Sequence, residues 1–380
     1  MPVHAFIFPG QGSQTVGMGR DLAAAFAAAR EVFQEIDETL KQKLSKLMFE
    51  GPHEELTLTE NTQPALLAHS LAVLRVLERE GGTTLQRKAL VVAGHSLGEY
   101  SALAAAGGFS AADAARLLKL RGRAMQKAVP AGIGAMAALL GADMEQARQI
   151  CAEAAPVPET GVPGTGVQNS GVAETGQRKT GEGRTGEGRT GEGRTGEGRT
   201  GEGRTGEGRT GEGRAGERKT GQREIVQPAN DNGGGQVVIS GHRGAVERAI
   251  EIAKQKGIRR ALLLPVSAPF HCALMAPAAE AMAEALRATP PKPPCVPLVA
   301  NVSARRESDP GQIRDLLIQQ VTATVRWREC VVAMTEMGVD RFIELGAGKV
   351  LTGLIKRIAP DASGLAAGSP AEIEAVLKRL

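Results

Sequence analysis

Leu90-Val91-Val92-Ala93-Gly94-His95-Ser96-Leu97-Gly98 is the stretch of sequence that decides the fold. Its first four residues are apolar, which predicts a short buried strand that ends at Gly94. The next five read Gly-X-Ser-X-Gly, and a helical pattern follows from Leu97 to about Ala106. A serine between strand and helix in this setting is a nucleophile elbow, where glycines avoid the clashes that side chains would cause. We therefore predict an α/β fold with Ser96 as a nucleophile; the alternative is an ordinary glycine-rich turn.

Strands and helices alternate on both sides of this stretch. His4 to Phe8 is an apolar strand, and a helix is expected over Ala111 to Ala128 with Ser110 as its N-cap. Further strands are expected near 298–300 and 341–344. This alternation predicts a hydrolase-like α/β domain whose sheet is mostly parallel.

The middle of the chain predicts a second, smaller domain in the order β-α-β-β-α-β, which is ferredoxin-like. Its strands are expected at 135–140, 224–227, 237–240 and 260–266, and its helices at 143–154 and 245–256. We place the large domain at 1–127 and 267–380, with the small domain inserted at 128–266.

A pentapeptide repeat, Thr-Gly-Glu-Gly-Arg, runs from Thr180 to Arg214 without one apolar residue. Such a segment cannot bury enough surface to offset its chain entropy, so residues of about 156–224 are expected to form a disordered surface insertion. The insertion would fall in a loop of the small domain, between its first helix and second strand. Nucleic-acid binding is the alternative, but the repeated Glu cancels the charge of the Arg.

Composition excludes several classes of protein. The formal net charge of +4 over 380 residues, without aromatic residues among the basic ones, gives no reason to expect nucleic acid as a partner. No apolar run approaches the length of a membrane span, and Met1 to Phe8 lacks the basic start of a signal peptide. The four cysteines show no metal-binding spacing. We expect a cytoplasmic protein, a monomer by default, without metal or cofactor.

A nucleophilic serine needs a base, and the chain offers six histidines: His4, His53, His69, His95, His242 and His271. His95 is adjacent to Ser96, and neighbours at a sharp turn point apart. His271 lies in the loop Ser267 to Cys272, directly after a predicted strand, where α/β enzymes place catalytic groups. A structural histidine at 271 remains the alternative at this point.

Two further features bear on the site. Pro9-Gly10-Gln11-Gly12-Ser13-Gln14 follows the first strand and offers backbone N–H groups, although it lacks the Lys-Ser/Thr ending of a phosphate loop. Arg121 lies on the helix after the elbow, and Gly122 is expected to leave space beside its side chain. Taken alone, Arg121 reads as an exposed helix residue.

Together these stretches resemble one family, the malonyl-CoA:acyl-carrier-protein transacylases and the related acyltransferase domains of polyketide and fatty-acid synthases. The resemblance covers Phe6 to about Lys356 apart from the repeat. It is carried by the stretches 8–14, 94–100, 121–126, 129–141, 235–241, 266–275, 301–302, 320–327 and 344–354.

The resemblance implies a dyad in which Ser96 is the nucleophile and His271 the base, oriented by the backbone carbonyl of Gln320. It implies an oxyanion hole formed by the backbone N–H groups of Gln11 and Leu97.

For the substrate, the resemblance implies that Arg121 pairs with the malonyl carboxylate, because its planar fork suits two parallel hydrogen bonds. Met125 and Phe270 would line the acyl pocket, and Asn232 would lie near the substrate. Malonyl-CoA and acyl carrier protein would then be the partners. The function would be to supply malonyl groups for fatty-acid or polyketide chain extension.

Two other interpretations of the function stay open. An α/β-hydrolase esterase shares the elbow but needs an acidic residue between Ser and His and an HGGG-type loop, and the loop is absent. A non-enzymatic interaction protein, in which the repeat carries the function, would have no use for Ser96, His271 and Arg121.

Overall fold

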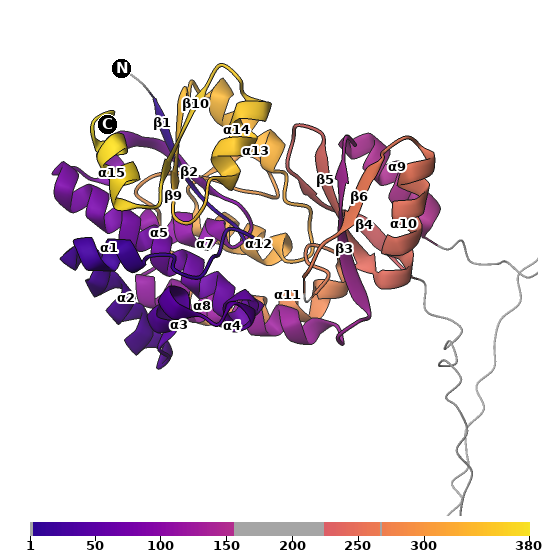
Figure 1. The fold of residues 1–380 in the computed structure, drawn as a ribbon, viewed down its shortest axis with the longest axis horizontal. Coiled ribbons are helices and arrows are strands. Elements are labelled where there is room, and N and C mark those ends of the chain that lie inside the picture. The colour runs from indigo at the N-terminus through magenta and orange to yellow at the C-terminus, as the bar shows by residue number, and fades with distance from the viewer. Residues whose placement is uncertain (1–2, 156–223, 267) are drawn as a thin grey trace, which may run out of the picture. The chain divides into compact units, whose positions relative to one another are not determined.

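The computed structural model describes residues 3–155, 224–266 and 268–380, and these contain two β-sheets flanked by helices (Figure 1). Sheet A has six strands in the order β10-β9-β1-β2-β7-β8. Its strands are β1 His4–Phe8, β2 Ala89–Gly94, β7 Leu298–Val299, β8 Arg306–Glu307, β9 Arg341–Leu345 and β10 Ser363–Ala367. Every pairing is parallel except that of β7 with β8.

Helices cover both faces of sheet A. Because side chains alternate along β1, Phe6 and Phe8 lie in one core with the helices over 59–81, 98–105 and 111–128. Ala5 and Ile7 lie in another core with the helices over 327–336 and 350–358. The helices of this part are α1 Arg20–Ala25, α2 Ala27–Leu40, α3 Leu44–Glu50, α4 His53–Thr57, α5 Thr59–Gly81, α6 Leu85–Lys88, α7 Gly98–Ala105, α8 Ala111–Ala128, the 3-10 turn η1 Ala273–Met275, α11 Ala276–Ala288, α12 Pro310–Gln320, α13 Trp327–Glu336, α14 Val350–Ile358 and α15 Pro370–Leu377. Among the described residues, none of the helices has the length and apolar content needed to cross a bilayer.

Sheet B is antiparallel, with strand order β4-β5-β3-β6. It is formed by β3 Gly134–Leu140, β4 Val226–Asp231, β5 Gln236–His242 and β6 Arg260–Leu263, and α9 Met144–Ala154 and α10 Arg243–Gln255 pack on one of its faces. The chain order β3-α9-β4-β5-α10-β6 is the predicted one, and the predicted fold class is confirmed. The domain boundaries at 127 and 266 stay a prediction, and the repeat between α9 and β4 lies outside the described residues.

Two predicted strands differ from the structure. β4 continues to Asp231, well beyond the expected 224–227, although it contains Pro228 and a polar end. Proline is tolerated here because β4 lies at the sheet edge and its pairing with β5 is irregular next to Pro228. β6 ends at Leu263 rather than residue 266, so that the chain can turn through Pro265 toward the site.

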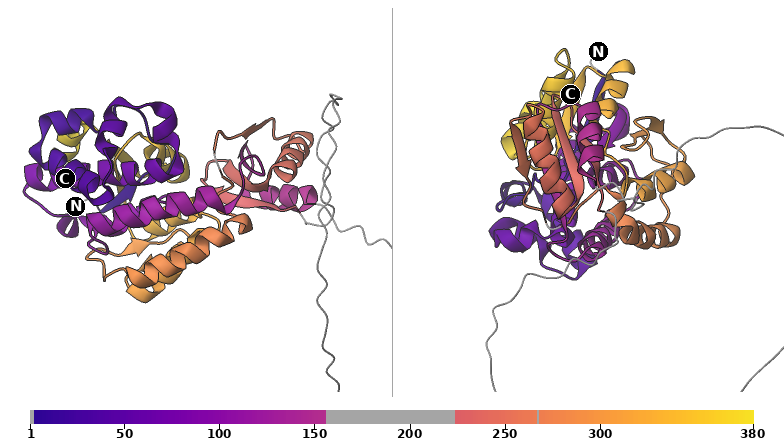
Figure 2. Two further views of the ribbon diagram at one scale, coloured as in Figure 1. Left: turned by 90° about the horizontal axis from the view of Figure 1, so that it is seen from below. Right: turned by 90° about the vertical axis from the view of Figure 1, so that its right-hand side faces the viewer.

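The expectation that Gly122 leaves space beside the side chain of Arg121 was wrong. A Cβ atom on Gly122 would lie 2.5 Å from Glu60 Cα and 2.6 Å from the carbonyl oxygen of Thr59. Gly122 therefore allows α8 to approach the start of α5, rather than making room beside Arg121. α8 is also flanked by α11, and the two run side by side in the view from below (Figure 2).

We predict that Gly122→Ala lowers the free energy of unfolding by at least about 2 kcal/mol, because backbone atoms must move to admit the methyl group. Gly353→Ala is the matched control, since Gly353 also lies within a helix but has open space around it. The control should be neutral or stabilising by about 0.5–1 kcal/mol. Urea denaturation of both variants measures the difference, and equal stabilities would contradict the tight packing of α8 on α5.

Candidate active site

Ser96 lies at the sharp turn between β2 and α7, in the left-handed region with φ of 55°. This conformation costs a residue with a side chain about 1–2 kcal/mol. The flanking glycines are required by close packing: a Cβ on Gly94 would overlap the backbone of Gly98, and one on Gly98 would overlap the carbonyl of Phe8. The turn therefore projects the serine side chain away from the sheet.

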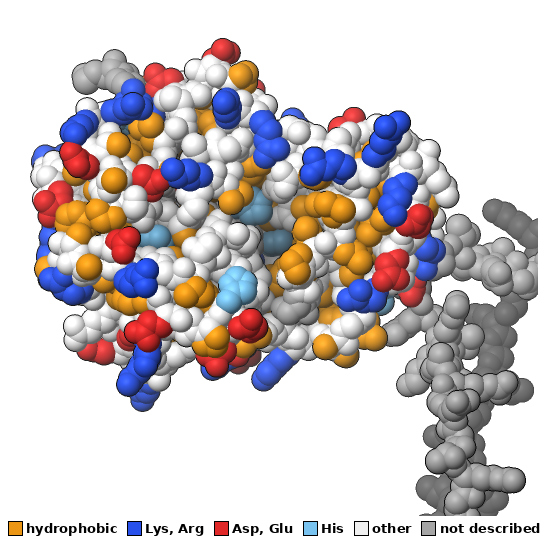
Figure 3. Space-filling model, viewed as in Figure 1, with side chains coloured by type: hydrophobic (Ala, Val, Ile, Leu, Met, Phe, Trp, Pro, Cys, Tyr) orange, Lys and Arg blue, Asp and Glu red, His pale blue; other side chains and the backbone are white. Residues whose placement is uncertain are grey.

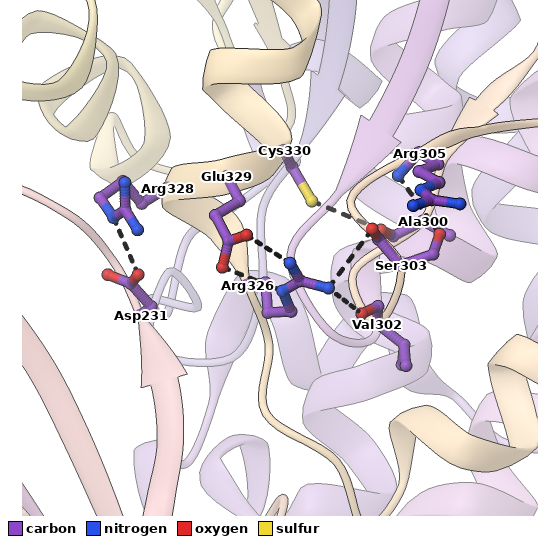
Figure 4. Close-up of polar contacts among 9 residues, drawn as sticks. All are labelled: Asp231, Ala300, Val302, Ser303, Arg305, Arg326, Arg328, Glu329 and Cys330. Carbon is purple, nitrogen blue, oxygen red and sulfur yellow. Dashed lines mark hydrogen bonds and ion pairs between the residues drawn. The ribbon is translucent and has the colours of Figure 1, made fainter. Parts of the chain in front are cut away.

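Asn301 holds this turn in place. Its side-chain oxygen accepts a hydrogen bond from the Ser96 N–H at 2.8 Å, and its Nδ2 donates to the carbonyl of Gly94 at 2.8 Å. The loop that carries Asn301 is itself fastened to the start of α13, because Arg326 donates to the carbonyl of Val302 at 2.9 Å (Figure 4). Asn301 is fully buried. A residue distant in sequence thus fixes the strained backbone of Ser96.

Ser96 and His271 are in direct hydrogen-bond contact. Ser96 Oγ lies 2.7 Å from His271 Nε2, and His271 Nδ1 lies 2.8 Å from the backbone carbonyl of Gln320. Because a carbonyl only accepts, Nδ1 carries the proton and Nε2 is left to accept from the serine hydroxyl. His271 also has a left-handed backbone, with φ of 57°. The pair has the geometry of a nucleophile and its general base.

The environment keeps this histidine neutral. Burial, together with the nearby positive charge of Arg121, lowers the pKa of His271 to about 3. A neutral imidazole is the form that accepts a proton, so the ring is in its basic form across the neutral range.

Arg121 lies beside the same hydroxyl and is 1% exposed. Its Nη2 donates to Ser96 Oγ at 3.3 Å and to Gln320 Oε1 at 2.8 Å, and its Nη1 donates to Gln63 Oε1 at 3.0 Å. Its Nε has no hydrogen-bond partner among the described residues. The guanidinium is held by neutral amides and by the face of Tyr100, 5.8 Å from its ring centre. A buried cation without a paired carboxylate at hydrogen-bond distance is suited to an anionic ligand.

Glu99 and the Gln320 side chain complete the network under the site. The Gln320 amide donates to the carbonyl of Ser96 at 2.9 Å and to the Glu99 carboxyl, which also accepts the Asn301 N–H at 2.5 Å. Burial raises the pKa of Glu99 to about 8. One buried carboxyl group thus ties the backbone of Asn301 to the side chain of Gln320, and these two residues hold Ser96 and Arg121.

Gln11 and Leu97 line the same cavity as Ser96. Gln11 belongs to the turn after β1, and Leu97 is the N-cap residue of α7, so its N–H group is at the positive end of that helix. Gly10 allows the first turn to approach the elbow, because a Cβ there would lie 2.7 Å from the carbonyl oxygen of His95. This arrangement suits the stabilisation of a developing oxyanion.

Ser96 opens into a cavity of about 480 Å³ between the two sheets. Met125 and Phe270 form part of its apolar wall, with Val238 from sheet B and Leu264, which directly follows β6. None of the described residues that line it is acidic. The space-filling view shows histidine side chains in a hollow here, with Lys and Arg side chains along its upper edge (Figure 3). The cavity therefore favours a ligand that is partly apolar and negatively charged.

Asn232 acts on the site through His95. Its side-chain oxygen lies 2.9 Å from His95 Nε2, and both residues line the cavity. The neighbouring Asp231 is buried and accepts a hydrogen bond from Arg328 at 2.9 Å (Figure 4). His95 therefore points to Asn232 rather than to Ser96 Oγ.

The structure brings the predicted site residues together. All line the cavity except Gln320, whose backbone and side chain lie directly behind it. Sequence reasoning missed the contributions of Gln63, Glu99 and Asn301. Glu99 and Asn301 stand in the stretches that carried the resemblance, whereas Gln63 had no local signal. Among the described residues, no group of His, Cys, Asp and Glu is arranged to hold a metal ion.

The chain belongs to the acyl transferase family: the family described as "Acyl transferase domain" matches residues 5–158 and 200–372. Among curated proteins, the malonyl CoA-acyl carrier protein transacylase of Escherichia coli (strain K12) is 40% identical over 100% of both chains. The enzyme of the same name from Bacillus subtilis (strain 168) is 40% identical over 99% of this chain and 96% of its own. The chain is therefore an acyltransferase.

Two solved structures of malonyl-transferring enzymes also match the chain over almost its whole length. The acyl-carrier-protein-S-malonyltransferase of Bartonella henselae has a TM-score of 0.80 and 47% identity, with 99% of each chain covered. A malonyl-transacylase solved in complex with a type II PKS acyl-carrier protein has a TM-score of 0.79 and 38% identity, with 100% of each chain covered.

We predict that the reactivity of Ser96 toward a fluorophosphonate stays constant as the pH falls from about 7 to about 5. The lowered pKa of His271 keeps its ring neutral there, whereas a histidine with its ordinary pKa of 6.5 would protonate and stop acting as a base. Glu99 stays protonated over the same range, because its pKa is raised. Mass-spectrometric labelling rates measure this, with Ser96→Ala as the blank. A half-maximal rate near pH 6.5 would contradict the burial of the pair.

Proposed function

We propose that the chain transfers the malonyl group of malonyl-CoA to the phosphopantetheine thiol of an acyl carrier protein, through a malonyl ester on Ser96. One observation carries the proposal: a hydroxyl 2.7 Å from a neutral imidazole and 3.3 Å from a buried arginine, in a cavity with no acidic side chain among the described residues that line it. The names of the relatives support the choice of malonyl-CoA and carrier protein as substrates.

In the first half-reaction, His271 Nε2 takes the proton of Ser96 Oγ as the oxygen attacks the thioester carbon. The backbone N–H groups of Gln11 and Leu97 stabilise the tetrahedral oxyanion, each contributing on the order of 3 kcal/mol. The carbon–sulfur bond then breaks, and the thiolate of CoA leaves with the proton that His271 returns. The carbonyl of Gln320 keeps the imidazole in the required tautomer throughout.

In the second half-reaction, the thiol of the carrier's phosphopantetheine enters the same cavity. His271 takes its proton, the sulfur attacks the malonyl ester, and Ser96 leaves as an alcohol with the proton returned. Because both thiols use one site in turn, the kinetics should be ping-pong.

Arg121 sets the choice of acyl group in this proposal. Its guanidinium lies beside the reacting oxygen, so the carboxylate of a bound malonyl group meets two N–H donors. Met125 and Phe270 enclose the short carbon chain between the carboxylate and the ester. Asn232 contributes by holding His95 in the wall of the cavity.

The remaining expectations from the sequence stay predictions. These are the division into a large domain of 1–127 and 267–380 and a small domain of 128–266, the monomeric state, the cytoplasmic location and the absence of a cofactor.

Intact-mass analysis tests the proposed function. Malonyl-CoA should add one malonyl group to the wild-type chain and none to Ser96→Ala, and holo-carrier protein should remove the adduct and gain its mass. An adduct that is lost to water at the same rate with or without carrier would favour the esterase reading. Absence of any adduct would contradict the acyl-serine mechanism.

We further predict that Arg121→Ala loses the preference for a carboxylated acyl group. The rate constant kcat/KM for acylation by malonyl-CoA should fall by about 100-fold, the value expected for a lost bidentate, charge-assisted contact. Acylation by acetyl-CoA should change by less than about threefold, since acetyl has no carboxylate. Arg123→Ala is the matched control, because Arg123 lies on the same helix but pairs with Glu60 at the surface. Equal losses with both donors would mean that Arg121 only supports the fold of the site.

A further inference from the structure

The orientation of Arg121 depends on two amide side chains. Gln63 and Gln320 each offer the guanidinium a side-chain oxygen, at 3.0 Å and 2.8 Å. An amide has an acceptor oxygen at one end and a donor NH2 group at the other, and the two ends have nearly the same shape. The other contacts of each amide therefore decide which end faces the arginine. A reversed amide would turn N–H groups against a cation.

The two amides differ in what holds their NH2 groups. The NH2 group of Gln63 contacts the Met125 sulfur at 3.7 Å, and a thioether is a weak acceptor. The NH2 group of Gln320 donates to the carbonyl of Ser96 at 2.9 Å and to the carboxyl of Glu99. Because Gln320 is fully buried, reversing it would set its oxygen against two other oxygens without relief from solvent. The orientation of Gln320 is therefore the more strongly specified of the two.

Glu99 directs this contact because its own orientation is fixed by the backbone. Its Oε1 accepts the Asn301 N–H at 2.5 Å, and a backbone N–H group is always a donor. Its Oε2 then faces the NH2 group of Gln320. A carboxyl oxygen keeps a lone pair for such a donor even when the group is protonated. Glu99 thus presents an acceptor to Gln320 in either protonation state.

The Gln320 amide also keeps the Glu99 carboxyl apart from the guanidinium. One end of the amide contacts Glu99 and the other contacts Arg121, so the amide lies between them. A carboxylate in direct contact with Arg121 would compete with the carboxylate of a substrate. The amide carries no charge of its own. It can therefore orient Arg121 and leave the positive charge available.

We propose that Glu99 is a positioning residue for acyl-group selection, because it fixes the orientation of the Gln320 amide. The amide in turn holds the Arg121 guanidinium beside Ser96 Oγ. The contacts run without a gap from the backbone N–H of Asn301 to the nucleophile. The proposal rests on the proposed transacylase function. It makes the preference for a carboxylated acyl group depend on a side chain that lies behind the cavity wall.

Glu99→Gln tests the proposal, because it keeps the shape of the side chain and reverses one of its contacts. The oxygen of the new amide stays with the N–H group of the fully buried Asn301, so its NH2 group meets that of Gln320. The mismatch passes to Arg121, which borders the cavity and has room to move. The ratio of kcat/KM for acylation by malonyl-CoA to that by acetyl-CoA should fall by about tenfold, the effect of one lost charge-assisted hydrogen bond.

Glu344→Gln is the matched control. Glu344 is also fully buried, and its carboxyl accepts the N–H groups of Leu351 and Thr352, so the new amide creates the same kind of mismatch. These residues lie on the face of sheet A opposite to α8. The control should keep the wild-type ratio between the two donors. An unchanged ratio in Glu99→Gln, or an equal fall in the control, would overturn the proposal.

Glu99→Asp is a milder variant that keeps both acceptor oxygens. Its shorter side chain weakens the contact with Gln320 and reverses nothing, so the ratio should fall by only about threefold. This variant decides the question where Glu99→Gln does not fold, and a ratio equal to that of the wild type would then overturn the proposal.

A double-variant cycle distinguishes a role through Gln320 from a direct one. Gln320→Met removes the amide and keeps the length of the side chain, and it should lower the same ratio by about tenfold. Adding Glu99→Gln to it should lower the ratio by less than about twofold more, because the two residues act on Arg121 in series. Losses that multiply to about a hundredfold would mean that Glu99 acts by another route, and would overturn the proposal.

Protection of Ser96 from a fluorophosphonate needs no acyl transfer, so it separates this proposal from the proposed function. Malonate should slow the labelling of the wild-type chain by binding Arg121, whereas neutral malonamide should not. The malonate concentration that gives half-protection should rise by about tenfold in Glu99→Gln and by less than about twofold in Glu344→Gln. Protection that Glu99→Gln leaves unchanged would overturn this proposal alone. Absence of protection in the wild-type chain would overturn it together with the role proposed for Arg121.

Discussion

The strained backbone of Ser96 is the constraint on which the rest of the site depends. A left-handed serine costs free energy, and the structure offsets that cost with a hydrogen bond from its N–H to Asn301 and with glycines that let β1, β2 and α7 meet. The same turn brings Oγ to His271, whose backbone is also left-handed. The nucleophile and base are therefore positioned by backbone conformation, so that their side chains need little adjustment before reaction.

Burial determines the protonation of every titratable group around this turn. Desolvation favours neutral forms, which lowers the pKa of His271 and raises that of Glu99. Arg121 remains the charged group in contact with Ser96, and its hydrogen bonds go to the neutral amides of Gln63 and Gln320. A buried cation held only by neutral partners leaves its charge available to a substrate carboxylate. In the proposed function, the selectivity for a charged acyl group and the neutral state of His271 thus both follow from burial.

Local patterns predicted the parts of the fold that depend on neighbouring residues. The strands around Ile7 and Val92 and the helix that begins after Ser110 agree with the structure, because periodicity and capping are short-range signals. The polar network behind Ser96 was not predicted, because Asn301 and Gln320 pair with the elbow from more than two hundred residues away. The resemblance supplied the backbone role of Gln320, but nothing in the pattern indicated that its side chain also contacts Arg121.

Sheet B forms one wall of the cavity, and it is connected to the residues that support Ser96. β4 is fastened to the rest of the fold by hydrogen bonds in both directions, from the Asp231 N–H to the carbonyl of Val325 at 2.9 Å and from the Val325 N–H to Ala229 at 2.8 Å. Val325 immediately precedes Arg326, which holds the loop of Asn301. The segment between α12 and α13 therefore connects the wall of the cavity to the support of the nucleophile. Sheet B and the loop that holds Ser96 are thus fastened to the same short segment, so the position of the cavity wall and that of the nucleophile share one support.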